Sequence, residues 1–243
     1  MATQFRYLTQ EQLIGLGALD MTLANQDVEE TFRLFDAGEC ILPSKVVLRW
    51  GDEASERTTR GHMNAMPGYV GGKYAMAGLK WAAGFYSNPI EYKLPAVTAT
   101  IVLNDPYKGI PVAIMDGTLI SAVRTGAMGG VAAKYLARPD SKTVGVIGAG
   151  VQARTMLASL KAAMPGLAAG LVYDIRPERS AIYAQEMGQR LGMTLQTAST
   201  ALEVATHVDI LVGATSAVEP VLGKGWVQAG SLFLQMGAYE CEL

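Results

Sequence analysis

The spacing of apolar positions changes along the first half of the chain, and each change predicts a different element. Leucines three residues apart follow the run T-Q-E-Q that begins at Thr9, a pattern typical of a helix with an N-terminal capping box. A second helical stretch over residues 27–37 ends at Gly38. A β-rich run follows at residues 45–50, which predicts a strand.

The strongest hairpin signal lies just before the middle of the chain. Two apolar, β-branched runs at residues 97–103 and 110–115 are separated by residues 104–109, which contain Asn, Asp, Pro and Gly. Turns need these residue types, so the pattern predicts two paired antiparallel strands. Together these elements predict an α+β unit with a largely antiparallel sheet over roughly the first 115 residues.

The second half of the chain is more regular. A long helix is predicted over residues 119–137, and its many Gly and Ala residues allow another backbone to pack very closely on it. Beyond it, short apolar strands alternate with helical stretches, which predicts an α/β fold with a parallel sheet covered on both faces. The strands are predicted at residues 143–147, 171–173, 194–197, 209–212 and 231–236, and the helices at residues 151–164, 177–191 and 199–205.

The composition argues against several classes of protein. The chain has 20 Lys and Arg against 22 Asp and Glu, a formal net charge of −2, which disfavours nucleic acid or an anionic membrane as a partner. Cys40 and Cys241 are far apart, as are His62 and His207, so neither a disulfide framework nor a metal site is expected. No apolar run approaches the ~20 residues of a membrane span. The N-terminus lacks the apolar core of a secretion signal, so we expect a cytoplasmic protein.

The most specific chemical signal is a G-x-G-x-x-A run that follows a predicted strand and opens a predicted helix. In this context Gly148 permits the tight turn, Gly150 lets the backbone approach a pyrophosphate, and Ala153 allows close helix–strand packing. The helix N-terminus then faces the phosphate charge. A glycine-rich turn without a ligand is the alternative. The predicted dinucleotide-binding residues are Gly148, Ala149, Gly150, Val151 and Gln152.

The end of the second strand of this pattern carries information about the nucleotide. Asp174 stands where a carboxylate accepts hydrogen bonds from the adenosine ribose hydroxyls, which favours NAD. Arg176 and Arg179 are the opposing feature, since a guanidinium can receive the 2′-phosphate of NADP. Both arginines are also typical of an exposed helix start. The prediction is NAD as cofactor and Arg176 as a further cofactor contact, with NADP left open.

Two cations lie in otherwise apolar segments. Arg124 lies within a helix of small and apolar residues, and Lys80 lies within an apolar, glycine-rich run. A buried guanidinium is costly unless it is paired, so its partner is either a protein carboxylate or a substrate carboxylate. For Lys80 the alternative is a surface lysine whose stem covers apolar surface. Beside a dinucleotide domain, the two cations suggest a small anionic substrate such as an amino or imino acid.

Several linked motifs give a more specific resemblance. They are N-D-P at residues 104–106, M-D-G-T at 115–118, S-A-x-R-T-G-A at 121–127, A-A-K-Y-L-A at 132–137 and G-A-G-V-Q-A at 148–153. With these motifs the chain resembles the ornithine cyclodeaminase/mu-crystallin family over residues 43–237. Residues 64–72 and 78–81 are most similar to a subgroup of the family that carries a tyramine oxidase label.

The resemblance implies an architecture and a reaction. It implies a homodimer whose subunits have an α+β substrate and dimerisation domain (residues 1–117), a connecting helix (118–138) and a Rossmann domain with bound NAD(H) (139–243). It also implies hydride transfer at the α-carbon of a small amino or imino acid, by cyclodeamination or a related reaction. One alternative is NAD(P)H-dependent reduction of a cyclic ketimine. Another is a non-catalytic protein that binds NAD(P)H, as the crystallin branch suggests.

The resemblance also carries roles over to particular residues. It makes Lys80 a catalytic and substrate-binding lysine beside the reacting carbon, Arg124 the carboxylate-binding arginine, and Asp174 the ribose-binding acid. A second family arginine corresponds to Lys45 here, or to Arg49 if the register shifts. A lysine is a point charge and does not reproduce the planar fork of an arginine.

The chain departs from the family pattern near the predicted active site. A carboxylate and a threonine of ornithine cyclodeaminase correspond to Asn64 and Ala96. The catalytic aspartate of the cyclodeaminase falls at Tyr239, and the neighbouring Glu240 is the candidate catalytic carboxylate. These departures weaken ornithine as the substrate but leave hydride transfer in place. Family members continue for tens of residues beyond the equivalent of Leu243, so we expect the Rossmann domain to be incomplete at its C-terminus.

Overall fold

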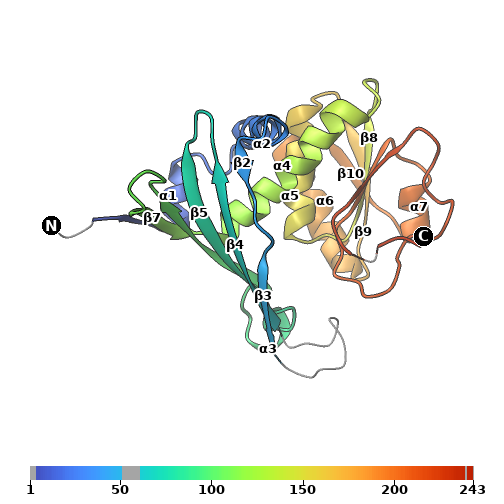
Figure 1. Ribbon diagram of the computed structural model, residues 1–243. Coiled ribbons are helices and arrows are strands. Elements are labelled where there is room, and N and C mark those ends of the chain that lie inside the picture. The colour runs from blue at the N-terminus through green and yellow to red at the C-terminus, as the bar shows by residue number, and fades with distance from the viewer. Residues whose placement is uncertain (1–3, 51–60, 239, 243) are drawn as a thin grey trace. The chain divides into compact units, whose positions relative to one another are not determined.

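The computed structural model describes residues 4–50, 61–238 and 240–242 (Figure 1). The chain divides into two compact units, and neither unit is continuous in sequence. The first unit comprises Met1–Leu19 and Glu29–Ser121, and the second comprises Asp20–Val28 and Ala122–Leu243. The second unit therefore takes in a short N-terminal segment that lies within the range predicted for the first domain.

The first unit is built on a seven-stranded sheet with strand order β1-β7-β6-β5-β4-β2, in which β3 also pairs with β4. Neighbouring strands are antiparallel except β1 and β7, which are parallel, so the predicted, largely antiparallel sheet is confirmed. The predicted hairpin is confirmed as β6 and β7. The elements are β1 (Arg6–Leu8), α1 (Gln10–Gly15), α2 (Met21–Asp36, shared by both units), β2 (Cys40–Ile41), β3 (Val46–Trp50), β4 (Gly61–Val70), β5 (Met76–Gly84), α3 (Asn88–Glu91), β6 (Val97–Asn104) and β7 (Pro111–Asp116).

The first two helices begin where side chains satisfy their free backbone N–H groups. The capping box of α1 is confirmed: the Thr9 hydroxyl accepts from the Gln12 N–H (3.3 Å), and the Gln12 side chain accepts from the Thr9 N–H (2.9 Å). Helix α2 begins at Met21, earlier than the predicted start at residue 27. The reason is Asp20, whose carboxylate accepts from two N–H groups of the first turn at 2.9 and 3.1 Å.

Strands β4 and β5 do not follow from the sequence pattern. They pair continuously from the His62–Gly84 pair to the Val70–Met76 pair. Both strands consist largely of Gly, Ala and Met, which do not give the alternation of β-branched and polar residues that marks a strand. Their strand conformation depends on their pairing with β3 and β6, which is tertiary context rather than local propensity.

The second unit contains a five-stranded parallel sheet with strand order β10-β9-β8-β11-β12. Helices α5 and α6 cover one face of this sheet, and α7 lies on the other (Figure 1). The predicted α/β fold class and each strand and helix predicted for this region are confirmed, with small shifts at their ends. The elements are α4 (Thr118–Leu136), β8 (Thr143–Ile147), α5 (Val151–Ala163), β9 (Ala169–Tyr173), α6 (Pro177–Leu191), β10 (Thr194–Thr197), α7 (Ala201–Ala205), β11 (Ile210–Gly213) and β12 (Leu232–Gln235).

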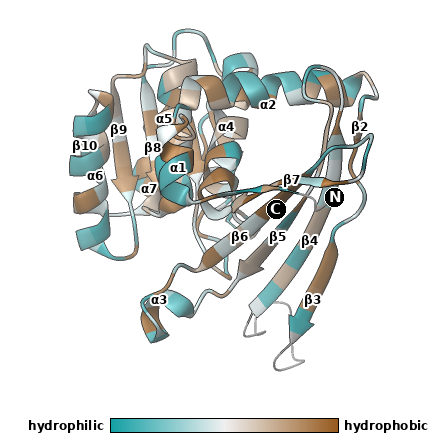
Figure 2. Cartoon of the chain, turned by 90° about the vertical axis from the view of Figure 1, so that its left-hand side faces the viewer, coloured by the Kyte–Doolittle hydropathy of each residue, from teal (hydrophilic) through white to brown (hydrophobic). Residues whose placement is uncertain are grey.

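The core of the second unit lies on both faces of its central strands. Val144 and Val146 of β8 and Leu211 of β11 are each 0% exposed. In Figure 2, β8 and β9 are brown over much of their length, whereas α6 alternates between teal and brown. This difference is expected, because a central parallel strand is buried on both faces and a covering helix on only one.

Helix α4 packs against α5 through backbone contact. A Cβ built at Gly126 would lie only 2.6 Å from the carbonyl carbon of Thr155. The close approach predicted for this glycine-rich helix is therefore confirmed. The segment of α2 in this unit also contacts α5, since Ser159 donates to the Asn25 side-chain oxygen at 2.6 Å and Asn25 donates back to the Ser159 carbonyl at 3.1 Å.

We expect Gly126→Ala to lower the thermal stability of the protein, because the added methyl group would force α4 and α5 apart. Overpacking of this kind costs about 1–3 kcal/mol. The matched control is Gly15→Ala in α1, where a Cβ meets nothing within 4 Å. Thermal unfolding should show a lower Tm for the Gly126 variant only. Equal Tm values for the two variants would contradict the backbone contact between α4 and α5.

Asp209, just before β11, joins the beginnings of two neighbouring strands. Its carboxylate accepts from the Lys142 N–H (2.9 Å), the Thr143 N–H (3.0 Å) and the Thr143 hydroxyl (2.8 Å), and it pairs with Arg138 at 2.5 Å. Burial alone would raise the pKa of Asp209. The hydrogen bonds and the Arg138 charge outweigh burial and lower the pKa below its usual value.

A carboxyl group with a lowered pKa stabilises the folded state above its unfolded pKa, and this contribution is lost as the pH falls through the folded pKa. Asp209→Asn should therefore reduce the free energy of unfolding at pH 7 by about 1–3 kcal/mol. The difference from wild type should shrink below about pH 4, where the unfolded carboxyl group protonates. Urea unfolding at pH 7 and pH 3 measures both values. A difference that does not change with pH would contradict the role of the Asp209 charge.

Candidate functional site

The turn between β8 and α5 has the geometry of a phosphate-binding loop. We call Gly148, Ala149 and Gly150 the glycine loop. Gly148 has φ +92°, and a Cβ there would lie 2.6 Å from the Ala214 carbonyl oxygen, so only glycine fits. At Gly150, by contrast, a Cβ would meet nothing within 4 Å. Gly150 is also the N-cap of α5 and has no side-chain cap, so no side chain occupies the helix N-terminus there.

The glycine loop lies at the topological switch point of the parallel sheet. Chain order runs outward from β8 to β9 and β10 on one side, then returns to β11 and β12 on the other. In open sheets of this kind, ligands bind outside the carboxyl ends of the strands where the order reverses. Asp174 follows β9 on one side of β8, and Ala214 follows β11 on the other. A nucleotide bound at this point would therefore meet residues from both sides.

Asp174 is held directly beside the glycine loop. One carboxylate oxygen accepts from the Ala149 N–H at 2.9 Å, and the other accepts from the Arg176 N–H at 3.0 Å. The Asp174 N–H itself donates to the buried Ser180 hydroxyl at 2.8 Å. Each carboxylate oxygen still has a free lone pair for a ligand hydroxyl. Arg176 is exposed at the start of α6, as is Arg179.

The structure adds Arg154, which the sequence patterns did not single out. Its guanidinium donates to the Ala149 carbonyl at 2.7 Å and to Glu186 at 2.8 Å, and it lies 5.1 Å from the centre of the Tyr183 ring. Arg154 therefore holds the glycine loop against α6. Its position one helical turn after Gly150 is the signal that would have found it, because residues four apart share one face of a helix.

Gln152 also differs from a simple first-turn residue. Its side-chain nitrogen donates to the Ala122 carbonyl of α4 at 3.3 Å. Its side-chain oxygen is buried and has no hydrogen-bond partner among the residues that the structure describes. An orphaned buried acceptor next to the glycine loop fits a site that holds a ligand with hydrogen-bond donors.

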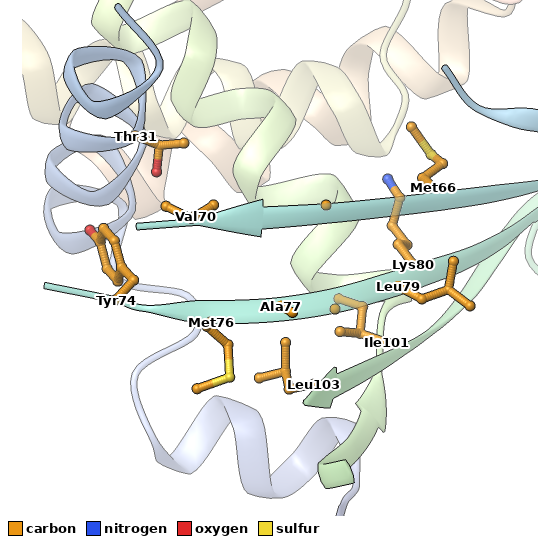
Figure 3. Close-up of a pocket in the computed structure, with 12 residues that line it drawn as sticks. Thr31, Met66, Val70, Tyr74, Met76, Ala77, Leu79, Lys80, Ile101 and Leu103 are labelled. Atoms are coloured by element: carbon orange, nitrogen blue, oxygen red, sulfur yellow. The ribbon is translucent and has the colours of Figure 1, made fainter. Parts of the chain in front are cut away.

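In the first unit, Lys80 lies at one end of an apolar pocket. The pocket has a volume of about 340 Å³ and is lined by residues of β4, β5 and β6 together with Thr31 of α2. Lys80 is the charged residue of this lining, and its amino group donates to the Ser121 hydroxyl at 3.1 Å. Figure 3 shows Lys80 beside Met66, with Thr31 and Tyr74 toward the other end. The arrangement suits a small molecule with an anionic group and an aliphatic part.

Asn64 lies on the same face of the sheet as Lys80. The register pairs Met66 with Lys80, and Asn64 is two positions before Met66 on β4. Residues two apart on a strand share a face. The Asn64 side-chain oxygen is buried without a hydrogen-bond partner among the described residues. The position at which the family resemblance has a carboxylate therefore carries an orphaned neutral acceptor here.

Arg124 lies in α4, three residues after Ser121, and its side chain is exposed. Its guanidinium contacts the Met128 sulfur at 3.6 Å. Within the described part of the chain, no carboxylate forms an ion pair with it, so the alternative of a protein partner gains no support. Nearby protein atoms remove enough water to lower the pKa of Arg124, but an arginine remains charged.

Lys45 and Arg49 lie at the edge where β3 pairs with β4. Lys45 is exposed and directly precedes β3, and Arg49 pairs with His62. Burial lowers the pKa of His62, and the charges of Arg49 and Lys45 lower it further. Both cations therefore act on the same strand that carries Asn64. The structure leaves the role of Lys45 as a substrate contact a prediction.

Glu240 is placed differently from a proton-transferring group. It is 0% exposed, and its carboxylate accepts from the Thr215 N–H at 2.5 Å and the Gly237 N–H at 2.8 Å. Tyr239, the other residue at the predicted position of the catalytic aspartate, lies outside the described residues. The described residues contain no group of three His, Cys, Asp or Glu side chains that could hold a metal ion. The described helices include none suited to crossing a bilayer.

Comparison with known proteins agrees with this geometry. The model of the ornithine cyclodeaminase/mu-crystallin family matches residues 9–242. The chain belongs to this family. It is 36% identical over 234 residues to an alanine dehydrogenase from Archaeoglobus fulgidus, a match that covers 95% of this chain and 66% of the relative. It is also 28% identical over 190 residues to the ketimine reductase mu-crystallin of Rattus norvegicus, which covers 74% of this chain and 55% of that protein.

Two solved structures of the family superimpose closely. One is a Delta(1)-pyrroline-2-carboxylate reductase from Thermococcus litoralis in complex with NADH and L-proline, with a TM-score of 0.85, 35% identity and coverage of 96% of this chain and 69% of that one. The other is an archaeal alanine dehydrogenase dimer with bound NAD, with a TM-score of 0.83, 35% identity and coverage of 94% and 66%. The chain thus spans about two thirds of the length of these relatives.

Proposed function

We propose that the protein binds NAD(H) and catalyses hydride transfer at the α-carbon of a small amino or imino acid. The observation that carries the proposal is the glycine loop, which is open at Gly150 and has the Asp174 carboxylate fixed beside Ala149. Similar loops hold a pyrophosphate at the helix N-terminus and a ribose on the acid. Support comes from two family structures at 35% identity, one with NADH and one with NAD bound.

When bound, the nicotinamide supplies the hydride acceptor or donor. The glycine loop and the N-terminus of α5 would hold the pyrophosphate, and Asp174 would accept hydrogen bonds from the adenosine ribose. A carboxylate at this place repels the 2′-phosphate of NADP, so we propose NAD as the preferred nucleotide. Arg176 and Arg179 are the groups that would favour NADP, and parallel titrations with NADH and NADPH decide between the two.

The proposed substrate contacts are cations of complementary kinds. Arg124 offers a planar fork for the substrate carboxylate, and within the described chain its charge is not taken up by an ion pair. Lys80, oriented by Ser121, would compensate charge or move a proton as the C–N bond changes order. Lys45 is the proposed second contact to the carboxylate.

The substrate class follows from how this chain departs from the cyclodeaminase pattern. Asn64 presents a neutral acceptor rather than a carboxylate, which does not favour a second, cationic amine on the substrate. The Glu240 carboxylate is also buried and occupied by backbone donors. We therefore favour oxidation of a monoamino acid or reduction of an imino acid over cyclodeamination of a diamino acid. The alternatives are cyclic ketimine reduction and NADH binding without turnover.

Two finer proposals rest on the family. A homodimer is proposed, because the archaeal alanine dehydrogenase is described as a dimer. Membership of the subgroup with the tyramine oxidase label is proposed on the similarity of residues 64–72 and 78–81. A panel of amino and imino acids with NAD(H) and NADP(H), followed by absorbance at the nicotinamide band, tests the activity. Turnover of a cyclic imino acid would favour the ketimine reductase, and tight NADH binding without any turnover would favour the carrier.

We expect Gly150→Ala to weaken NADH binding without weakening the fold. A methyl group there meets no protein atom within 4 Å but would occupy the space through which a phosphate approaches the backbone. The dissociation constant for NADH, measured by fluorescence titration, should rise about tenfold or more, a cost of ~1.4 kcal/mol. The control is Gly166→Ala, after the other end of α5, whose nearest contact is the flexible end of Lys142. Unchanged NADH affinity of Gly150→Ala would contradict the proposed site.

Arg124→Met tests the carboxylate contact. Loss of a charge-assisted, bidentate hydrogen bond costs about 2–3 kcal/mol, so kcat/KM for the best substrate of the panel should fall roughly 30- to 150-fold. NADH affinity should remain within about twofold of wild type, because the proposed contact is to the substrate. The exposed Arg190→Met in α6 is the matched control. Turnover of Arg124→Met within a few-fold of wild type would refute the assignment.

A further inference from the structure

Glu240 is a charged residue enclosed in the protein. It is 0% exposed, and both oxygens of its carboxylate accept hydrogen bonds from backbone N–H groups. One oxygen accepts from Thr215 at 2.5 Å, and the other accepts from Met236 at 3.2 Å and from Gly237 at 2.8 Å. Its own carbonyl oxygen accepts from the N–H groups of Val221 and Leu222 at 3.1 and 2.9 Å. Side chain and backbone of this residue are thus both fixed.

The surrounding chain leaves room for this carboxylate at two glycines. A Cβ at Gly213, the last residue of β11, would lie 2.7 Å from a Glu240 carboxylate oxygen. A Cβ at Gly237 would lie 2.7 Å from the Glu240 carboxylate carbon. Within the described residues, no lysine, arginine or histidine forms an ion pair with Glu240. The backbone N–H groups therefore replace water as the partners of the buried charge.

The contacts of Glu240 lead to the glycine loop in two steps. The Thr215 N–H is bonded to the Glu240 carboxylate, and Ala214 directly precedes Thr215. The Ala214 carbonyl oxygen occupies the place where a Cβ of Gly148 would otherwise lie, 2.6 Å away. The Ala214 N–H also donates to the Ile147 carbonyl at 2.9 Å. The segment that supports the tight turn at Gly148 is therefore fixed by Glu240.

We propose that Glu240 is a positioning residue of the nucleotide site. It holds the backbone that follows β11 and β12, and through Ala214 it keeps the glycine loop in the shape that a dinucleotide needs. The inference rests on the proposed function for its ligand. Because β11 and β12 lie on the side of the switch point opposite Asp174, the nicotinamide half of the ligand depends on Glu240 more than the adenosine half does.

Glu240→Gln separates this role from proton transfer. The amide has nearly the same shape but only one acceptor oxygen. If that oxygen keeps the two donors of Met236 and Gly237, the amide NH2 group faces the Thr215 N–H, and this tether is lost. The matched control is Glu242→Gln, since Glu242 accepts from the Lys224 N–H at 3.1 Å but is exposed.

Three measurements on the wild-type chain and both variants test the proposal. Amide hydrogen exchange should become faster at residues 214–215 in Glu240→Gln. The dissociation constant for NADH should rise about tenfold or more, whereas that for AMP should stay within about twofold. Glu242→Gln should match wild type in all three. If Glu240→Gln does not fold, Glu240→Asp, which keeps the charge but has a shorter reach, is measured in the same way and should show the same pattern.

Two results would overturn the proposal. Wild-type exchange and NADH affinity in Glu240→Gln, together with a loss of turnover, would make Glu240 a catalytic carboxylate. An equal loss of NADH and AMP affinity would show a general loss of structure instead of positioning at one side. A wild-type chain that does not bind NADH would refute the proposed function, and the exchange comparison would still decide whether Glu240 fixes the two segments.

Discussion

Backbone N–H groups that donate to carboxylates hold the parallel sheet of the second unit at both of its ends. At the amino ends of the strands, Asp209 accepts from the first residue of β8 and the segment before it. At the carboxyl ends, Asp174 accepts from the glycine loop, and Glu240 accepts from the segments after β11 and β12. A carboxylate oxygen can accept more than one bond, so a single side chain can join segments that are distant in sequence. The loops around the switch point are fixed in this way, although they make no strand ladders there.

The two units divide the chemistry between rigid backbone and side chains. In the second unit, the candidate nucleotide site consists mostly of backbone, with Asp174 and Arg154 fixing its shape. In the first unit, the pocket on the sheet has an aliphatic lining and places Lys80 and Asn64 on the same face. Such a division suits a family in which one cofactor serves several small substrates, because the pocket residues can change while the nucleotide loop remains constant.

The sequence was informative where structure is decided locally. The capping box at Thr9, the hairpin of β6 and β7 and the βα alternation after residue 143 all follow from patterns within a few residues. Strands β4 and β5 could not be predicted, because their Gly, Ala and Met residues become strands only through pairing with their neighbours. Among the site residues, the glycine loop and Asp174 were found from spacing. The role of Glu240 could not be, because Thr215 and Gly237 approach it only in the folded chain.

Helix α2 has a consequence for how the two units can be inherited or exchanged. Residues Asp20–Val28 belong to the second unit and the remainder of the helix to the first, while α4 crosses the division again after Ser121. A recombination event with a single crossover between the substrate and nucleotide halves would separate Asn25 from Ser159, its hydrogen-bond partner in α5. Members of this family that exchange nucleotide units intact would need a second crossover inside or near α2. The discontinuity therefore favours divergence by point substitution in the pocket over shuffling of whole domains.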